Sequence, residues 1–277
     1  MKLRCGAATL DLSGPVVMGI LNVTPDSFSD GGRFSGPRTA ALAVERGLEL
    51  ADEGAAIIDV GGESTRPGAA PVSVAEELRR VLPVVEGLLR RGVVVSVDTS
   101  KPEVMRAAAA AGAHMVNDVC GLTLPGALEA AAASNCAVTL MHMRGDPRTM
   151  QRDPVYADVV GDVRAWLLGR VADCRAGGID ADRIAIDPGF GFGKTPAHNL
   201  ELVRRLGEFT ATGLPVLMGM SRKSTVGVLT GRPVDGRLAG SLAFAAVAAL
   251  QGAHIIRAHD VAATVDAVKV AQAVKGS

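Results

Sequence analysis

The sequence predicts an α/β protein, a single-domain (β/α)₈ TIM barrel, and three observations lead to this prediction. Eight short apolar runs recur along the chain, and a segment of good helix formers follows each of them. Near-continuous apolar runs are typical of parallel strands that are covered on both faces. Eight such units fit into 277 residues, which is a usual size for this barrel. A doubly wound open sheet is the alternative, but it normally carries a glycine fingerprint after its first strand, and none is present here.

The apolar runs define the expected strands in order. They cover residues 16–21, 57–60, 93–97, 115–116, 137–141, 183–186, 215–218 and 255–256. Six of the runs have four to six residues, and the runs at 115–116 and 255–256 are shorter. Most runs end at a glycine or at a polar residue. These lengths are typical of buried parallel strands rather than of helices.

The segments between the runs define the expected helices. Helices are expected over residues 38–53, from Ser73 onward and from Ser100 to Gly112. Further helices are expected over residues 125–134, 153–177, 196–206, 235–251 and 261–274. Ser73 with Glu76, and Ser100 with Glu103, have the spacing of capping boxes. Asp153-Pro154 has the pattern of an N-cap followed by proline at the first helical position. Residues 1–14 are expected to form a small hairpin that closes the bottom of the barrel. No linker-like stretch interrupts residues 1–277, so one domain is expected.

Composition excludes several classes of function. Hydrophobic residues make up 48% of the chain and 29 basic residues balance 29 acidic ones, as in a globular protein with a full core. A net charge of zero argues against nucleic acid or an anionic membrane as a partner. The longest apolar run, Leu242 to Leu250, is too short to span a membrane, and no signal peptide is seen.

The four cysteines indicate a cytoplasmic protein. Cys5, Cys120, Cys136 and Cys174 contain no CxxC pair, so neither a zinc site nor a redox motif is expected from them. We expect reduced cysteines that pack in the core, which suits a cytoplasmic location.

Polar residues stand at nearly every expected strand end. In a TIM barrel the active site lies at these carboxyl ends. The residues are Asn22, Glu63-Ser64-Thr65-Arg66, Asp98, Asn117, His142, Asp187, Lys223, Arg257 and His259. Each alone could be a helix cap or part of a surface ion pair. Together, at one end of the fold, they predict an active site.

Two kinds of chemistry can be read from these residues. Asp98, Asn117 and Asp187 offer acceptors and a donor that suit a planar heterocycle with an amino-pyrimidinone edge. Acid/base work on a sugar is the competing interpretation, but no row of sugar-binding aromatic residues supports it. A local group of cations suits a phosphate or pyrophosphate, and barrel phosphate sites often use the loops after strands seven and eight. These cations are Arg66, Arg222, Lys223, Arg257 and His259.

Magnesium is the metal that fits the sequence. No HExxH spacing exists, so zinc is not expected, and His114, His142, His198 and His254 are interpreted as structural. Mg²⁺ needs only a few protein oxygens beside a phosphate, and Asn22 could supply one. The long polar loop that starts at Asn22 is interpreted as functional, with a flexible surface loop as the alternative.

Five motifs carry a resemblance to a known family. They are Asn22-Val-Thr-Pro-Asp-Ser-Phe-Ser-Asp-Gly-Gly32, Asp59-Val-Gly-Gly-Glu-Ser-Thr-Arg-Pro-Gly-Ala69, Ser96-Val-Asp-Thr-Ser-Lys101, Asp187-Pro-Gly-Phe-Gly-Phe-Gly-Lys194, and Gly219-Met-Ser-Arg-Lys-Ser224 with Arg257-Ala-His-Asp260. In order and content, these motifs resemble those of the dihydropteroate synthases of folate biosynthesis. Alanine between Arg257 and His259 is a mild variation on the valine that is familiar there.

The resemblance implies a transferase reaction. Para-aminobenzoate displaces pyrophosphate from 6-hydroxymethyl-7,8-dihydropterin pyrophosphate in an S_N1-like step, and 7,8-dihydropteroate forms. The resemblance also implies Mg²⁺, competition by sulfonamides and a homodimer, for which the Ala-rich helix Leu238 to Gln251 is a candidate surface. Neither nucleic acid nor a membrane is an expected partner.

The resemblance also implies a role for each matching residue. Asp98, Asn117, Asp187 and Lys223 would bind the pterin. Asn22, Arg257 and His259 would hold the pyrophosphate, with Asn22 as the metal ligand, and Lys223, Arg257 and Asn22 would be the catalytic residues. The para-aminobenzoate site would comprise Thr65, Arg66, Pro67, Phe28, Phe190, Phe192 and Ser224.

Two other functions stay open from the sequence. One is a related pterin-binding barrel that transfers a methyl group from a methylated folate to a corrinoid protein. It would share the pterin ligands but would not need the Asn22–Gly32 loop or the Ser221-Arg-Lys segment. The other is a paralogue that binds pterins without catalysis.

Overall fold

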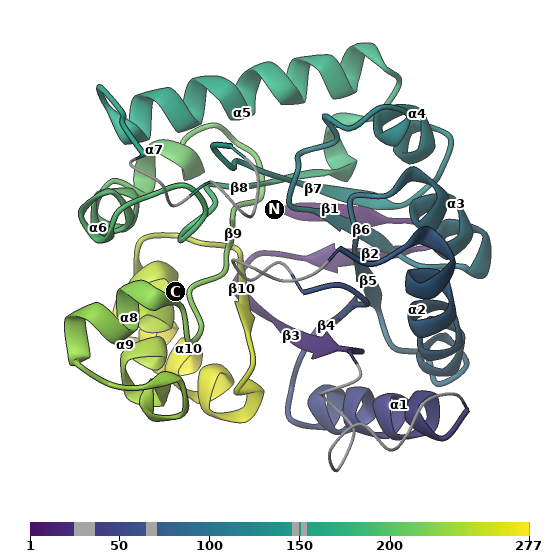
Figure 1. Ribbon diagram of the computed structural model, residues 1–277. Helices are drawn as coiled ribbons and strands as arrows, with labels where there is room; N and C mark the ends of the chain where they lie inside the picture. The colour runs from purple at the N-terminus through teal and green to yellow at the C-terminus, as the bar shows by residue number, and fades with distance from the viewer. Residues whose placement is uncertain (25–36, 65–70, 146–149, 151–153, 277) are drawn as a thin grey trace.

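The computed structural model describes residues 1–24, 37–64, 71–145, 150 and 154–276 (Figure 1). Its centre is an eight-stranded parallel sheet in the order β8-β7-β6-β5-β4-β3-β10-β9. These strands are β3 (Val16–Asn22), β4 (Ile57–Gly61), β5 (Val95–Asp98), β6 (Met115–Asp118), β7 (Ala137–Met141), β8 (Ile184–Asp187), β9 (Leu217–Met218) and β10 (Ile255–Ala258). A parallel bridge between Ile186 and Val216 joins the two outer strands. The sheet therefore closes on itself, which confirms the TIM barrel and sets aside the open sheet.

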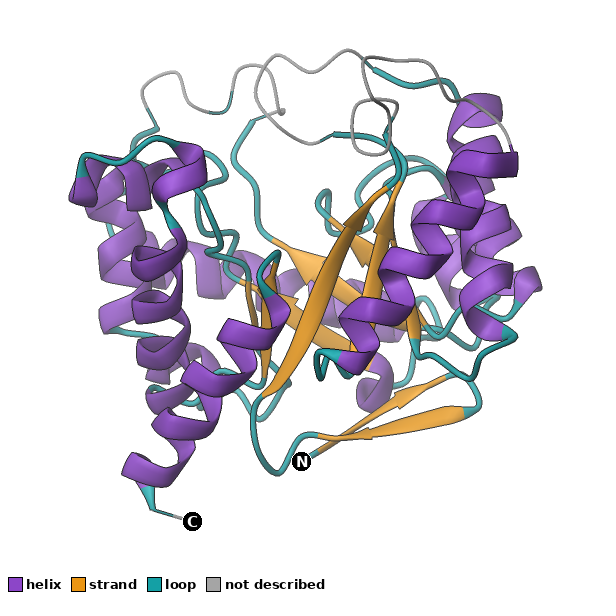
Figure 2. Cartoon of the chain, turned by 90° about the horizontal axis from the view of Figure 1, so that it is seen from below, coloured by secondary structure: helices purple, strands orange, loops and turns teal. Residues whose placement is uncertain are grey.

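Helices cover the outside of this barrel (Figures 1 and 2). They are α1 (Pro37–Asp52), α2 (Val74–Leu89), α3 (Pro102–Ala111), α4 (Ala127–Ala132), α5 (Val159–Ala176), α6 (Pro196–Arg204), α7 (Gly207–Thr210), α8 (Ser224–Thr230), α9 (Leu238–Leu250) and α10 (Val261–Lys275), with 3₁₀ turns at Ala181–Arg183 and Val234–Gly236. The side chains that point outward from the strands, such as Ile58, Val97 and Ile186, are buried beneath these helices. No helix in the described part of the chain is long and apolar enough to cross a membrane.

The predicted hairpin is present at the start of the chain. Strands β1 (Lys2–Cys5) and β2 (Ala8–Asp11) pair antiparallel and lie across the end of the barrel where the strands begin (Figure 2). Leu3, Cys5 and Leu10 pack there against the lowest layer of side chains inside the barrel. That layer consists of Met18, Ile57, Met115, Ala137, Ala185, Leu217 and Ile255. The amino end of the barrel is thus filled with apolar side chains.

Of the three helix starts predicted from N-cap residues, two are wrong and one is confirmed. Ser73 Oγ accepts a hydrogen bond from Glu76 N at 3.2 Å, as a cap should. Helix α3 instead begins at Pro102 without a side-chain cap, because the Ser100 hydroxyl donates to the buried Asp118 carboxylate.

The start of α5 also differs from the prediction. This helix begins at Val159, and Asp158 rather than Asp153 caps it by accepting from Val160 N at 3.2 Å. Asp158 is also held by Arg205 at 2.8 Å, a long-range contact that local spacing does not reveal. Asp153 itself lies outside the described residues.

Candidate active site

The described strand-end residues lie together at the carboxyl end of the barrel. Asn22, Asp98 and Asp187 are the last residues of β3, β5 and β8. Asn117 and Arg257 belong to β6 and β10. In a strand every second side chain points to the same face. These side chains therefore point into the barrel, whereas their neighbours Val97, Val116 and Ile256 face the helices.

A buried network joins four of these strands. Asp59 Oδ2, from β4, accepts hydrogen bonds from Asn117 Nδ2 at 2.9 Å and from Arg257 Nε at 2.6 Å. Arg257 Nη2 then donates to Asp98 Oδ2 at 2.7 Å. The single guanidinium is shared between two carboxylates inside the barrel, where charge-assisted bonds of this kind are strong.

The network sets the charge of its members. Burial raises the pKa of Asp98 to about 7, although the Arg257 guanidinium acts against that rise and Asp59 adds to it. Burial alone would lower the pKa of Arg257, but the two carboxylates outweigh it and raise the pKa above its usual range. Arg257 therefore stays a cation between the two carboxylates.

Asp187 and Lys223 form the second part of the lumen. Asp187 Oδ1 accepts from Gly189 N at 2.7 Å, and burial raises the pKa of this carboxyl while Lys223 opposes the rise. Lys223 Nζ donates to Phe190 O at 2.5 Å and lies 4.4 Å from the centre of the Phe192 ring. Burial lowers the pKa of Lys223 to about 8. The pair offers an acceptor and a nearby cation, as expected from the sequence.

A buried lysine that was not among the predicted site residues supports this part of the site. Lys194 Nζ lies within 3.0 Å of His142 Nδ1, Gly189 O and Phe192 O. Burial lowers the pKa of Lys194 to about 7 and that of His142 to about 3, so the imidazole is the neutral acceptor. A Cβ at Gly189, whose φ is +71°, would lie 1.8 Å from the His142 carbonyl oxygen. Lys194 thus fixes the turn after Asp187. In the sequence, the signal for this role was a lone lysine at the end of a Gly-Phe repeat.

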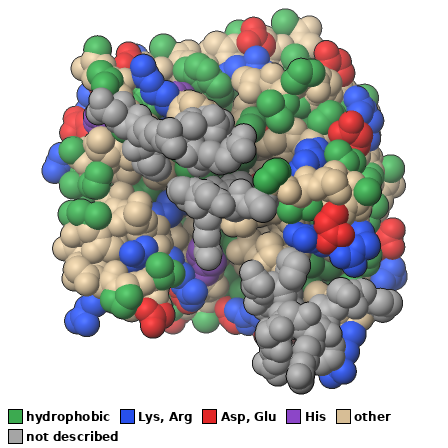
Figure 3. Space-filling model, viewed as in Figure 1, with side chains coloured by type: hydrophobic (Ala, Val, Ile, Leu, Met, Phe, Trp, Pro, Cys, Tyr) green, Lys and Arg blue, Asp and Glu red, His purple; other side chains and the backbone are tan. Residues whose placement is uncertain are grey.

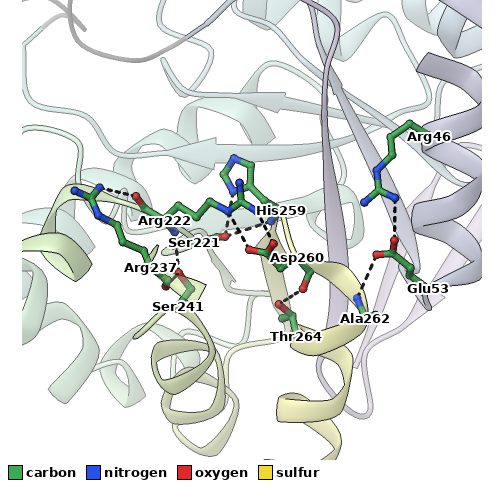
Figure 4. Close-up of polar contacts among 10 residues, drawn as sticks. All are labelled: Arg46, Glu53, Ser221, Arg222, Arg237, Ser241, His259, Asp260, Ala262 and Thr264. Atoms are coloured by element: carbon green, nitrogen blue, oxygen red, sulfur yellow. Dashed lines mark hydrogen bonds and ion pairs between the residues drawn. The ribbon is translucent and has the colours of Figure 1, made fainter. Parts of the chain in front are cut away.

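The segments after β9 and β10 carry the remaining cations (Figure 4). The Arg222 guanidinium donates to both Asp260 oxygens, so its charge is paired at the start of α10. The Arg222 backbone, at a φ of +58°, is held by Ser241 Oγ and by Arg237 Nη1 at 2.9 Å each. His259 Nδ1 lies 3.0 Å from Ser221 Oγ. Four of the five expected cations, Arg222, Lys223, Arg257 and His259, lie at this end of the barrel, whereas Arg66 lies outside the described residues. The carboxylates beside Arg222 and Arg257 balance much of the positive charge.

The surface around the mouth agrees with this balance. Figure 3 looks onto the face seen in Figure 1, where basic and acidic side chains are interspersed rather than separated into fields. No group of three or more His, Cys, Asp or Glu residues that could hold a metal occurs among the described residues.

The expected para-aminobenzoate residues are only partly described. Phe28, Thr65, Arg66 and Pro67 lie outside the described residues. Phe192 lies beneath the Lys223 ammonium, whereas the Phe190 ring is fully buried and packs on Phe244 of α9 with ring centres 5.3 Å apart. Ser224 is the first residue of α8, and its side chain is exposed.

Comparisons with known proteins agree with this arrangement. The pattern of the family described as "Pterin binding enzyme" matches residues 18–259. The dihydropteroate synthase of Escherichia coli K12 is 55% identical over 274 residues, which are 99% of this chain and 96% of that protein. The chain belongs to the dihydropteroate synthase family. The family member from Haemophilus influenzae is 52% identical, over 99% of this chain and 98% of its own.

Solved structures of dihydropteroate synthases also match the whole chain. The enzyme of Xanthomonas albilineans with 4-aminobenzoic acid has a TM-score of 0.93 at 53% identity, covering 100% of this chain and 98% of that one. The same organism's enzyme in complex with 7,8-dihydropteroate has a TM-score of 0.90 at 50% identity, with 100% of both chains covered. The Yersinia pestis enzyme with a sulfonamide drug has a TM-score of 0.94 at 50% identity, again with 100% of both chains covered.

Proposed function

We propose that this protein joins para-aminobenzoate to 6-hydroxymethyl-7,8-dihydropterin pyrophosphate, giving 7,8-dihydropteroate and pyrophosphate. Membership of the dihydropteroate synthase family supports the reaction. The single structural observation that carries it is the barrel lumen, where buried acceptors from Asp98, Asn117 and Asp187 face the cations Lys223 and Arg257. Such a lumen suits a flat, amide-like heterocycle that carries a polyanion.

The pterin would occupy the lumen. Its amino-pyrimidinone edge presents N–H donors, and Asp187 is the acceptor that matches them best because only one of its oxygens is used by Gly189 N. Asn117 and Asp98 would take the opposite edge, and the Lys223 ammonium would donate to a carbonyl or ring nitrogen. A buried site with a few placed polar groups fixes the orientation of its ligand.

The chemical step would begin with loss of pyrophosphate. Breaking the bond between the pterin methylene carbon and the pyrophosphate oxygen leaves a cation that is conjugated with the ring, and the neutral arylamine then adds to that carbon and loses a proton. Arg257 and His259 would stabilise the negative charge that develops on the leaving group. No strong base is required, because the arylamine nucleophile is neutral.

Mg²⁺ is the proposed cofactor, and the residues present fit it. Asn22 Oδ1 borders the space beside Gly61, where an added Cβ would lie 3.7 Å from it, whereas Asp98 Oδ2, 3.8 Å from the same point, is bonded to Arg257. The missing side chain leaves room beside hard oxygen atoms, which are the ligands Mg²⁺ prefers. Asn22 would hold the ion, and the bound ion would neutralise charge on the pyrophosphate.

We expect Asn22→Ala to raise the Mg²⁺ concentration needed for half-maximal activity about tenfold, because one oxygen ligand is lost. Activity is measured over a Mg²⁺ titration, with Asn135→Ala, a surface asparagine far from the mouth, as the matched control. A Mg²⁺ dependence that is unchanged in Asn22→Ala would remove Asn22 as the ligand.

The proposed reaction is tested by following pyrophosphate release with and without para-aminobenzoate. Release together with an equal amount of pteroate supports the synthase. Release without pteroate means that the cation forms but the aryl site is defective. No release with bound pterin would favour the binding-only paralogue or the methyltransferase.

Sulfonamides provide a second check, on the aryl site alone. We expect them to raise the KM for para-aminobenzoate without lowering the maximal rate, because they resemble that substrate. A sulfonamide is bound by the related Yersinia pestis enzyme. Inhibition that excess para-aminobenzoate does not relieve would contradict a shared site.

We further propose a cytoplasmic homodimer. Large apolar side chains are exposed on α8, α9 and α10, and burying them would favour association. They include Val228, Leu229, Leu238, Val247, Leu250, Val270 and Val274. All four cysteines are unpaired, as suits a reducing compartment. Sedimentation of the protein with Val228→Glu should show a shift toward monomer relative to wild type.

A further inference from the structure

Asp59 is a buried carboxylate to which the proposed reaction assigns no role. It lies within the apolar run Ile57-Ile58-Asp59-Val60, and its side chain is 0% exposed. A charge in such a place is costly unless it is paired and hydrogen-bonded. Its Oδ2 atom holds two partners, while Oδ1 has none among the described residues. A hydrophobic residue would have filled the same space without this cost, so the carboxylate calls for a functional reason.

The partners of Asp59 come from opposite sides of the barrel. Along the sheet order, β6 with Asn117 is two strands away on one side and β10 with Arg257 is two strands away on the other. Asp59 Oδ2 therefore bridges the lumen and connects a proposed pterin ligand with a proposed pyrophosphate ligand.

The bond to Asn117 fixes which way its amide faces. Asp59 Oδ2 also accepts from Arg257 Nε, so it meets Asn117 as an acceptor, and the NH₂ group of Asn117 faces it. The carbonyl oxygen of Asn117 must then take the other side. Asp59 thereby makes Asn117 a hydrogen-bond acceptor toward a ligand, whereas a free amide could present either atom.

The bond to Arg257 fixes its guanidinium in the same way. Asp59 takes Nε, and Asp98 takes one proton of Nη2. Among the described residues, the Nη1 group of Arg257 makes no hydrogen bond, so it stays available to a bound anion. Without Asp59, the guanidinium would be free to turn and pair with Asp98 through two bonds, which would occupy the Asp98 oxygens and withdraw the cation.

We propose that Asp59 is a positioning residue that orients Asn117 toward the pterin and Arg257 toward the pyrophosphate, an inference that rests on the function proposed above. Asp59 does not itself touch the reacting atoms in this scheme. Its effect on binding must therefore pass through the two residues it holds.

The test compares Asp59→Asn with Asp118→Asn. Asp118 is also fully buried on a strand, but it faces away from the lumen and accepts from Cys120 N and Leu122 N. Calorimetry with 6-hydroxymethylpterin, which lacks pyrophosphate, should show about tenfold weaker binding for Asp59→Asn. The KM for para-aminobenzoate should change less than about twofold, because no bond to the proposed aryl residues is lost. Asp118→Asn should lower the melting temperature and leave pterin affinity as in wild type.

A double-mutant cycle distinguishes positioning from loss of structure. In an Asn117→Ala background, Asp59→Asn should weaken binding of the same pterin by less than about twofold, because the residue it acts through is gone. The pterin pyrophosphate should bind more tightly than 6-hydroxymethylpterin. In Asp59→Asn alone this ratio of affinities should be about threefold smaller than in wild type, because Arg257 turns away. Equal losses in both backgrounds would show that Asp59 acts only through the fold, and the inference would be overturned.

A measurement on the wild-type protein keeps the inference testable if Asp59→Asn does not fold. The Asn117 side-chain NH₂, assigned by its loss in Asn117→Ala, should exchange slowly with solvent in nuclear magnetic resonance spectra of the free protein. Fast exchange would overturn the proposed bond to Asp59. Failure of the wild-type protein to bind the pterin at all would contradict the proposed function instead.

Discussion

Asp187→Asn should weaken pterin binding about a hundredfold, because a buried acceptor becomes partly a donor against the same edge of the ligand. Asp187 is 5% exposed, and one of its oxygens is bonded to Gly189 N while the other is open to the ligand. In the amide, one of the two positions must carry NH₂. If the carbonyl oxygen keeps the bond to Gly189 N, the NH₂ group faces the pterin. Calorimetric titration with 6-hydroxymethylpterin measures the loss.

A surface variant controls for the change of charge. Asp173 pairs with Arg170 on α5, far from the barrel mouth, and its side chain is 61% exposed. Asp173→Asn removes the same charge and should leave pterin affinity unchanged. Should Asp187→Asn bind the pterin as tightly as Asp173→Asn does, Asp187 is not the ligand for that edge.

Lys223→Ala should lower kcat/KM about a hundredfold while the protein stays folded. The Lys223 ammonium lies above Phe192, bonds to the Phe190 carbonyl oxygen and faces Asp187, so its removal takes away a cation of the lumen. Initial rates and thermal melting of the variant separate loss of activity from loss of fold. Lys269→Ala, on the exposed side of α10, is the matched control.

The pH dependence of the wild-type enzyme offers a second measurement on Lys223. Burial lowers the pKa of Lys223 to about 8, so the ammonium is lost as the pH rises through that value. Wild-type kcat/KM should then fall above pH about 8, and the remaining activity of Lys223→Ala should lack this fall. Activity retained in Lys223→Ala, or the same alkaline fall in both proteins, would mean that another residue supplies the cation.

The barrel and the positions of its strand-end residues were predictable from the sequence for a physical reason. Parallel strands buried on both faces give short apolar runs, and a polar residue such as Asp98 at the end of a run stands out clearly. Closure of the barrel places all carboxyl ends in one ring, so Asn22 and Asp187 lie at the same end of the barrel although they are far apart in the chain. The ends of helices were harder to predict, because Ser100 and Asp158 are bound to distant partners.

The pairing inside the site could not be predicted in the same way. Asp59, Asn117 and Arg257 meet across the lumen, and nothing in their spacing indicates which carboxylate takes the guanidinium. A signal for Asp59 was present, since an acidic residue is unusual within a buried strand. The pairing of Arg222 with Asp260 likewise depends on how the segments after β9 and β10 turn, and it changes how much positive charge the mouth presents.

Among the described residues, the hairpin at the start of the chain closes the amino end of the barrel and leaves the carboxyl end as the open one. Leu3, Cys5 and Leu10 fill the amino end, so a molecule that binds at Asp187 must enter and leave through the carboxyl end of the barrel. If the pterin lies deepest, as proposed, it must bind before para-aminobenzoate, and whatever lies above it must leave before it can be released. A single open end thus imposes an order of ligand binding and release, which the chemistry alone would not require.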